Sequence, residues 1–335
     1  MLFPIDSPTS PLIGIARMAA ESGMLEGKRR VEYRDLASKS YVTRCSNPQL
    51  PFQWTVNPYR GCEFGCKYCY ARYTHEFMEL RDGMLFETRI FAKQFHATAF
   101  RQELRRLPLG ETIAIGTATD PYQPAERRYG ITRKMLEVLA LEPGFRVWIT
   151  TKSDLVRRDI DLLQKIAVHT PLHVNMTVTT MDASLARLTE PFAPMPELRM
   201  AAVKELREAG IRAGVSLSPI LPLINDSEES IGRVFAAARE ADANWVWHNV
   251  LFLRSSARAV FFPFLEEQFP KLVKKYQERF RAGDFITGAY LEFVKERVEK
   301  MRGVYGLGRA EARHEIEAVK TRQLMLEWGA GSSST

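Results

Sequence analysis

Three of the four cysteines in the chain fall within eight residues, at Cys62, Cys66 and Cys69. Gaps of three and two residues separate them, and Gly61 and Gly65 are typical of a loop. A tight loop with this spacing lets three thiolates converge on one centre. Thiolates hold iron–sulfur clusters and also zinc, so the spacing predicts a metal or cluster site rather than a disulfide framework.

The number of ligands bears on which metal is held. Structural zinc normally takes four protein ligands, and here Cys45 or His75 would have to supply the fourth. Three thiolates on a four-iron cluster would leave one iron with an open coordination position, as a catalytic centre needs. The spacing alone leaves zinc, an electron-transfer cluster and a catalytic cluster open.

Composition limits the class of protein. The chain has 335 residues, of which 45% are hydrophobic and 26% charged, which allows two domains or one α/β barrel with extensions. No stretch approaches the roughly 20 apolar residues of a membrane span, and residues 1–17 show no secretory signal, so we expect a cytoplasmic protein without a membrane partner. The formal charge of +7 is compatible with nucleic acid as a partner, but basic pairs such as Arg105-Arg106 and Arg157-Arg158 are typical of solvated helix faces.

Apolar, β-rich runs alternate with amphipathic stretches of helical length, which predicts right-handed β-α-β units and a parallel sheet. We therefore expect an α/β fold with a partial (β/α)6 TIM-type barrel, and a doubly wound sheet is the alternative. The predicted strands are Gln53–Val56, Thr112–Gly116, Arg146–Thr150, Leu172–Thr179, Arg212–Leu217 and Trp245–Leu251. The predicted helices are Phe91–Leu107, Ile131–Leu141, Asp154–Val168, Pro196–Ala209 and Ser227–Ala241.

The pattern divides the chain into four segments. Residues 1–50 are predicted to form an irregular, basic N-terminal arm, and residues 51–262 the barrel. Residues 263–328 are predicted to form a helical C-terminal cap, and the Gly/Ser-rich tail 329–335 is expected to be disordered. The helices expected in the cap are Phe264–Arg281, Phe285–Met301 and Arg309–Trp328.

The cysteine loop also carries a family resemblance. The segment Asn57–Arg72 (NPYRGCEFGCKYCYAR) follows the first strand and places an aromatic residue, Tyr68, before the last cysteine. In these features the chain resembles the radical S-adenosylmethionine superfamily, and more closely its spore photoproduct lyase-like branch, often labelled DNA repair photolyases. The similarity of layout extends from about Glu32 to about Arg281.

The resemblance implies an enzyme in which Cys62, Cys66 and Cys69 bind a [4Fe-4S] cluster and the fourth iron is chelated by S-adenosyl-L-methionine. One electron from the reduced cluster would cleave the sulfonium and give a 5′-deoxyadenosyl radical, which abstracts hydrogen from a substrate. A cluster of low potential implies a flavodoxin or ferredoxin as electron donor. Tyr68 would lie near the adenine.

Ligands of an α/β barrel gather at the C-terminal ends of its strands. Small hydroxylated residues after the second strand suit the amino group and ribose of the nucleoside. A lysine after the third strand matches the lysine that pairs with the methionyl carboxylate in the branch. Polar residues on one face of the fourth and fifth strands would complete the site, because buried polar groups need partners or a cavity. The cofactor-binding residues predicted in this way, in addition to Tyr68, are Thr117, Thr119, Lys152, Asn175, Ser216 and Ser218.

The catalytic residues are less constrained. His248 on the sixth strand is a candidate, although a histidine on an apolar strand is more often a packed core residue. Spore photoproduct lyase returns a hydrogen atom to its product radical from a cysteine after the second strand, where this chain has Thr117. Tyr122 and Tyr129 are therefore candidates for relaying that hydrogen. Three functions stay open: radical chemistry on nucleic acid, radical modification of a peptide or small molecule, and a non-enzymatic zinc or iron–sulfur module.

Overall fold

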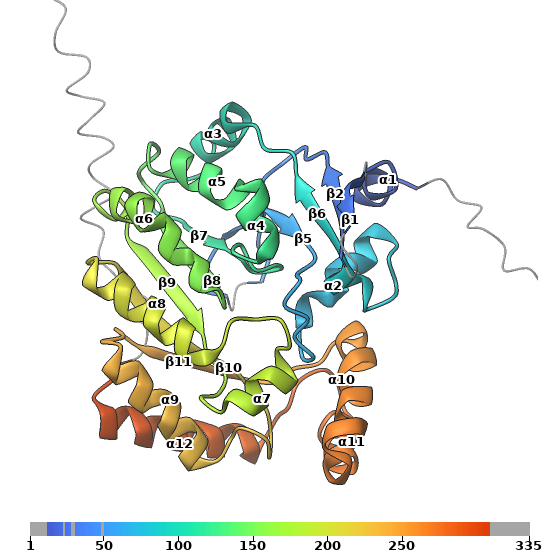
Figure 1. Cartoon of the computed structure of the whole chain (residues 1–335), viewed down its shortest axis with the longest axis vertical. Helices are drawn as coiled ribbons and strands as arrows, with labels where there is room; N and C mark the ends of the chain where they lie inside the picture. Colours follow the sequence, from blue (N-terminus) through green and yellow to red (C-terminus); the bar gives the residue numbers. More distant parts are fainter. Residues whose placement is uncertain (1–11, 23, 28–30, 48–49, 309–335) are drawn as a thin grey trace, which may run out of the picture.

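The computed structural model describes residues 12–22, 24–27, 31–47 and 50–308. Within them the larger sheet has seven strands in the order β11-β10-β9-β8-β7-β4-β3 (Figure 1). Neighbours from β4 to β11 pair in parallel, and β3 pairs with β4 in the antiparallel sense. No pairing among the described residues closes the sheet, so the predicted partial barrel is confirmed. The bounds are Val42–Arg44 (β3), Trp54–Val56 (β4), Thr112–Ile115 (β7), Arg146–Thr151 (β8), Leu172–Thr177 (β9), Arg212–Ile220 (β10) and Val246–Val250 (β11).

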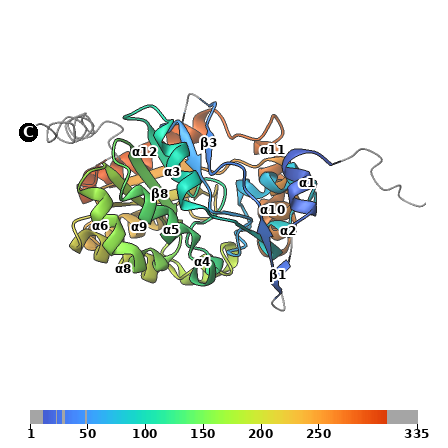
Figure 2. The same cartoon turned by 90° about the horizontal axis from the view of Figure 1, so that it is seen from above.

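Helices return the chain between the parallel strands and cover one face of this sheet (Figures 1 and 2). The strand residues that face them are fully buried and apolar, such as Val174 and Met176 of β9. Four of the predicted helices are confirmed within a few residues, the second of them as a 3-10 turn that continues into α6. The bounds are Pro124–Tyr129 (α4), Ile131–Leu139 (α5), Asp154–Asp159 (η2), Ile160–Ala167 (α6), Ala183–Thr189 (α7), Pro196–Glu208 (α8) and Glu228–Glu240 (α9).

The opposite, inner face of the sheet is filled by aromatic rings toward the N-terminal ends of its strands. The ring of His173 packs between Trp148 and Trp245, with centroid distances of 6.0 Å and 5.0 Å. Gly214, which pairs in register with Asn175, makes room for this layer, since a Cβ atom there would lie 2.3 Å from the Trp245 indole. The layer blocks one end of the partial barrel and leaves the C-terminal edge for ligands.

A second sheet, of four strands among the described residues, has the order β1-β2-β6-β5. The expectation that residues 1–50 are irregular is wrong, because α1 and the strands β1, β2 and β3 lie there. The helix predicted over Phe91–Leu107 is wrong in its first part, where β6 pairs in parallel with β2. The bounds are Gly14–Ala20 (α1), Met24–Gly27 (β1), Glu32–Leu36 (β2), Tyr59–Arg60 (β5), Tyr70–Met78 (η1), Leu85–Thr88 (α2), Arg89–Lys93 (β6) and Ala97–Arg105 (α3).

The C-terminal helices cover two separate parts of the molecule. α10 packs on η1, whereas α12 packs on α9 and β11 (Figures 1 and 2). The helix expected to begin at Phe264 begins earlier, because α10 accommodates Pro263 in its interior. The segment boundaries at residues 51 and 263 stay predictions, and the helix predicted over Arg309–Trp328 and the tail 329–335 lie outside the described residues. The bounds are Ser255–Gln268 (α10), Pro270–Leu272 (η3), Val273–Arg279 (α11) and Ala289–Tyr305 (α12).

Membrane spans are absent from the described part of the chain, where every helix is too short or too polar to pass through a bilayer.

The contact between Gly214 and Trp245 predicts a stability change. Gly214→Ala places a methyl group inside the indole, so we expect a loss of about 1–3 kcal/mol in the free energy of unfolding. Gly303→Ala in α12 is the matched control, because its Cβ atom would meet nothing within 4 Å, and we expect a gain of about 0.5 kcal/mol. Urea unfolding of both variants measures the difference. Equal changes in the free energy of unfolding of the two variants would contradict the close approach of Gly214 to Trp245.

Candidate active site

The three clustered cysteines lie in the loop between β5 and η1 and are free thiols. Cys62 and Cys66 are buried, and Cys69 is half-buried. Burial raises the pKa of the Cys66 thiol to about 12, with a further rise from Cys69 and an opposing effect of the Lys152 charge. Burial also raises the pKa of Cys62, and Cys66 and Cys69 add to it. Cys62 and Cys66 therefore lie in a region of low polarity, close enough to Cys69 for its charge to act on both.

An iron–sulfur cluster requires thiolate donors that converge on one centre. As the side chains stand, no three His, Cys, Asp or Glu residues of the described chain are disposed to hold a metal ion. The thiols themselves nevertheless suit a cationic cluster. Buried thiols with raised pKa values do not ionise together in the absence of a partner, and cationic iron replaces the protons when thiolates bind it.

Gly61 determines how closely the cysteine loop approaches the second sheet. Its φ angle is +83°, and a Cβ atom would lie 2.8 Å from the carbonyl oxygen of Phe86. Its own carbonyl oxygen accepts hydrogen bonds from Thr119 Oγ1 at 2.5 Å and from Gln123 Nε2 at 3.0 Å. Thr119, predicted to contact the cofactor, therefore uses its hydroxyl proton to hold the loop.

Buried charges hold the loop from behind. Arg72 Nη2 lies 2.6 Å from a carboxylate oxygen of Glu87 and also donates to the carbonyl oxygen of Cys66 at 3.0 Å. On the other side, Glu63 accepts a hydrogen bond from Tyr33 of β2 at 2.7 Å. Tyr33 of β2, Arg72 of η1 and Glu87 of α2 thus support the cysteine loop from behind.

Glu190 is the centre of a buried charge network beside the loop. Its carboxylate pairs with Arg199 at 2.5 Å and accepts a hydrogen bond from the hydroxyl of Tyr68. Burial alone would raise the pKa of Glu190, but Arg199 and Lys152 lower it below its ordinary value. Burial likewise opposes the charge of Lys152, but Cys66 and Glu190 raise its pKa, so this lysine stays protonated. Lys152 Nζ lies 5.6 Å from the centroid of the Tyr68 ring.

The ends of β7 and β8 are joined next to this network. Gly116 has a φ angle of +89°, and a Cβ atom there would lie 2.5 Å from the carbonyl oxygen of Thr150. Asp120 accepts hydrogen bonds from the backbone N–H of Lys152 and from Thr151 Oγ1, both at 2.7 Å. These contacts orient the segment from which the side chain of Lys152 extends toward Tyr68.

Comparison with known proteins identifies the family. A family model described as the radical SAM superfamily matches residues 56–234, which is more than half of the chain and includes the cysteine loop and Lys152. The chain belongs to the radical SAM superfamily. Membership makes it an enzyme and implies S-adenosylmethionine and an iron–sulfur cluster.

Similar proteins agree with this assignment. An uncharacterized protein of Mycobacterium tuberculosis is 35% identical over 309 residues, which cover 91% of this chain and 89% of that protein. One from Methanocaldococcus jannaschii is 29% identical over 223 residues, or 65% of this chain and 77% of that protein. A solved structure of spore photoproduct lyase complexed with dinucleoside spore photoproduct has a TM-score of 0.63 at 13% identity, with 82% of this chain and 79% of that chain covered. A variant of that lyase with bound AdoMet and the same dinucleoside has a TM-score of 0.61 at 13% identity and covers 80% and 78% of the two chains. The spore photoproduct lyase-like fold is therefore confirmed.

The other predicted cofactor residues of this radical SAM enzyme lie at or near the inner face of the sheet. Ser216 and Ser218 alternate with buried apolar residues and share that face with Asn175, because directly paired residues of parallel strands point the same way. Asn175 Oδ1 already accepts a hydrogen bond from Trp245 Nε1 at 3.0 Å. Thr117 follows the end of β7, close to the cysteine loop. Contacts of these residues with the cofactor stay predictions.

The two tyrosines considered as hydrogen relays have different surroundings. Tyr122 is fully buried, and burial raises the pKa of its phenol well above the ordinary value. Tyr129 packs edge-on against the ring of Tyr33, with centroids 5.7 Å apart. The hydroxyl of Tyr70, which directly follows the last cysteine, donates a hydrogen bond to the carbonyl oxygen of Thr117. The tyrosine that contacts Thr117 is therefore Tyr70.

His248 lies on the side of the sheet that faces the helices. It pairs in register with Leu217, whereas Ser216 pairs with Trp247. Because side chains alternate along a strand, His248 shares its face with the buried Val246 and not with Ser216. The structure does not bring His248 to the inner face.

Sequence reasoning missed the buried charges that support the loop. Glu190 and Arg199 lie far along the chain from Tyr68, and Glu87 of α2 lies 15 positions after Arg72 of η1. No spacing rule connects such residues before the fold is known. The signal that was available is the position of Glu190 before a proline, in a turn that follows α7.

The Glu190 network predicts a large loss of stability on neutralisation. Glu190→Gln keeps an acceptor for Tyr68 but leaves the buried guanidinium of Arg199 without its counter-charge, so we expect a loss of about 3 kcal/mol or more. Glu205→Gln is the matched control, because Glu205 pairs with Arg157 at the surface and is 44% exposed, where less than about 1 kcal/mol is at stake. Urea unfolding of the metal-free proteins compares the two. Similar losses in the free energy of unfolding of the two variants would contradict a stabilising role of the Glu190 carboxylate.

Proposed function

We propose that Cys62, Cys66 and Cys69 hold a [4Fe-4S] cluster and that the enzyme cleaves S-adenosylmethionine reductively. When bound, the cluster supplies the electron that breaks the sulfonium bond and yields methionine and a 5′-deoxyadenosyl radical, which abstracts hydrogen from a substrate. The observation that carries the proposal is a half-buried Lys152, with its Nζ atom 5.6 Å from the Tyr68 ring, beside three clustered cysteines that follow the first of six parallel strands. Three thiolates leave one of four irons for the amino and carboxylate groups of the methionyl moiety.

Lys152 has the charge and position to bind the methionyl carboxylate. Its ammonium group lies 5.6 Å from the centroid of the Tyr68 ring, and Cys66 and Glu190 raise its pKa, so it would meet an anion in its charged form. Tyr68, whose hydroxyl is held by Glu190, presents its ring to the same region and suits the adenine. Ser216 and Ser218 would supply hydroxyl contacts to the ribose from the inner face.

The electron for this reaction comes from outside the chain. Cleavage of a sulfonium requires a cluster of low potential, and the clustered cysteines are the sole cluster ligands that the described residues offer. We infer that a flavodoxin- or ferredoxin-type protein reduces the cluster.

For the substrate we propose a nucleic acid. Beside the last cysteine, the ring of Tyr70 lies 5.1 Å from Phe252, which stacks on Phe285 at 5.3 Å, and Phe285 is 60% exposed. Arg254 lies over the ring of Tyr73 at 4.3 Å in the same region. Rings with nearby arginines bind unpaired bases by stacking and phosphates by charge. The spore photoproduct lyase of similar fold is complexed with a dinucleoside photoproduct, which supports the proposal.

The cluster assignment predicts the behaviour of cysteine variants. Cys66→Ser should lose iron and sulfide and should lower production of 5′-deoxyadenosine by at least 100-fold, because the cluster loses one of its three thiolates. The measurement uses protein purified and reconstituted without oxygen, then incubated with dithionite and S-adenosylmethionine.

Cys45→Ser is the matched control, since Cys45 lies outside the loop, and it should retain iron and activity. A colourless wild-type protein with one bound zinc would support the non-enzymatic module instead. Retained 5′-deoxyadenosine production in Cys66→Ser would contradict the ligand assignment.

The substrate proposal predicts binding of single-stranded oligonucleotides. Phe252→Ala should weaken binding about 10-fold, because stacking of a base on an aromatic ring contributes about 1–3 kcal/mol. Leu141→Ala is a control at an exposed apolar position near the end of α5, and it should change nothing. Fluorescence anisotropy across a salt series measures both. Negligible affinity of the wild-type protein for oligonucleotides at every salt concentration would rule out nucleic acid as the substrate. It would favour the alternative of a peptide or small-molecule substrate.

A further inference from the structure

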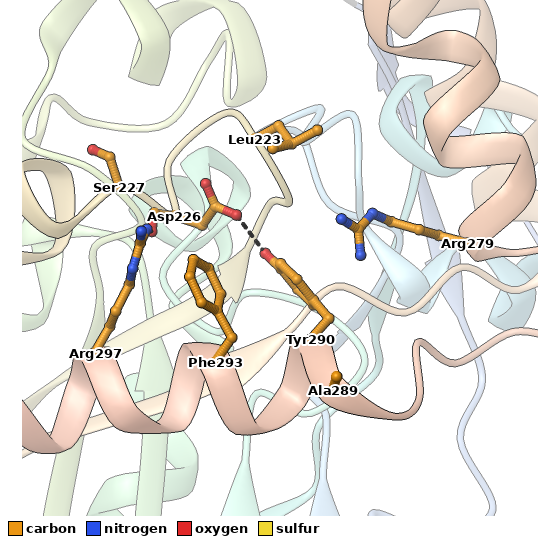
Figure 3. A pocket seen from close by; sticks show the side chains of 8 residues that line it. All are labelled: Leu223, Asp226, Ser227, Arg279, Ala289, Tyr290, Phe293 and Arg297. Atoms are coloured by element: carbon orange, nitrogen blue, oxygen red, sulfur yellow. Dashed lines mark hydrogen bonds between the residues drawn. The ribbon is translucent and has the colours of Figure 1, made fainter.

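A second concave site lies away from the cysteine loop, between α11, α12 and the loop that joins β10 to α9 (Figure 3). It is an open pocket with a volume of about 650 Å³. None of the residues that line it belongs to the cysteine loop or to the Glu190 network. Its size is in the range of sites for small organic ligands.

Two arginines converge on this pocket from opposite sides. Arg279 lies over the ring of Tyr290 at 4.4 Å, and Arg297 lies over the ring of Phe293 at 3.9 Å (Figure 3). A guanidinium that rests on an aromatic face keeps its N–H groups directed outward in its own plane. The two rings therefore hold the two cations in place while most of their donors stay available.

The charges of the pocket do not cancel. Asp226 is the one acid among the described lining residues, and it is buried, with its carboxylate oxygen accepting a hydrogen bond from Tyr290 at 2.7 Å. Arg297 contacts the backbone oxygen of Asp226 at 2.5 Å and not its carboxylate. Among the described residues, neither Arg279 nor Arg297 forms an ion pair with an acid. Two guanidinium groups thus face one carboxylate that is already engaged.

The loop that forms one wall is rigidly held. Asn225 donates to the carbonyl oxygen of Thr179 at 2.8 Å and accepts from the N–H of Leu221 at 2.5 Å. The hydroxyl of Tyr276 donates to the carbonyl oxygen of Pro222 at 2.7 Å. These bonds fix Asp226 and the neighbouring Leu223 before any ligand binds, which lowers the cost of ordering the site on binding.

We propose that this pocket binds a small organic anion, with its phosphate or carboxylate group between Arg279 and Arg297. Guanidinium groups match the geometry of both oxyanions and bind them with two parallel hydrogen bonds. The apolar body of the ligand lies against Phe293, Tyr290 and Leu223, whose side chain is 46% exposed. The site is separate from the one proposed for S-adenosylmethionine.

Phenyl phosphate, phenol and inorganic phosphate test this assignment by isothermal titration calorimetry on the full-length protein. Phenyl phosphate combines the oxyanion with an apolar ring, so it should bind saturably and at least 10-fold more tightly than either fragment. Arg279→Gln and Arg297→Gln should each weaken it at least 10-fold. Asp226→Asn should strengthen it several-fold, because it removes the opposing charge while keeping an acceptor for Tyr290.

Lys295→Gln is the matched control. It removes one positive charge from the exposed face of α12 without touching the pocket, and it should leave the affinity unchanged. An equal loss in Lys295→Gln would show attraction by net charge alone and overturn the proposal, as would the absence of saturable binding to the wild-type protein. Saturating S-adenosylmethionine should leave the affinity for phenyl phosphate unchanged, and competition would assign the binding to the cysteine site. Circular dichroism of each variant confirms that a lost affinity is not a lost fold.

Discussion

Burial of Cys62 and Cys66 in one loop is the constraint to which the rest of the site responds. Burial and the neighbouring thiols raise the pKa values of these two groups, so their thiolate forms need cations nearby. The fold supplies one permanent cation, Lys152, next to Cys66. Glu190 keeps that lysine protonated, and Arg199 in turn keeps Glu190 ionised. The described chain thus carries a framework of fixed charges that suits the proposed cluster and the carboxylate of S-adenosylmethionine.

The parallel sheet makes this framework possible because its strands all end at one edge. Lys152 follows the end of β8, and Asp120 from the end of β7 holds its backbone. The aromatic layer around His173 occupies the inner face toward the N-terminal ends of the strands, so polar groups gather at the C-terminal edge of the sheet. Support for the cysteine loop comes from other elements, because Tyr33 of β2 bonds to Glu63 and Arg72 of η1 donates to the carbonyl oxygen of Cys66. The larger sheet and the elements behind the loop therefore both contribute to the site.

The sequence predicts well whatever depends on local pattern. The cysteine spacing, the six parallel strands and the position of Lys152 at a strand end all follow from short segments. It fails where a partner comes from far along the chain: β6 became a strand because β2 pairs with it, and Glu190 became part of the site because it meets Tyr68, 122 positions earlier. Thr119 shows a third case. The sequence indicates a hydroxyl group that could contact the cofactor, but in the structure this hydroxyl donates to the carbonyl oxygen of Gly61.

The arginines of the chain include some that pair with acids and some that lie on aromatic rings, and composition alone cannot distinguish the two groups. One basic pair that the sequence indicates as a solvated helix face is held by acids: Arg157 pairs with Glu205 at 2.7 Å, and Arg158 pairs with Glu126 at 2.7 Å. Other arginines rest on aromatic rings instead. Arg254 lies over Tyr73 near the cysteine loop, and Arg279 and Arg297 line the second pocket. Since a ring holds a guanidinium without neutralising it, these three arginines keep their charge at the two sites where we propose that anions bind.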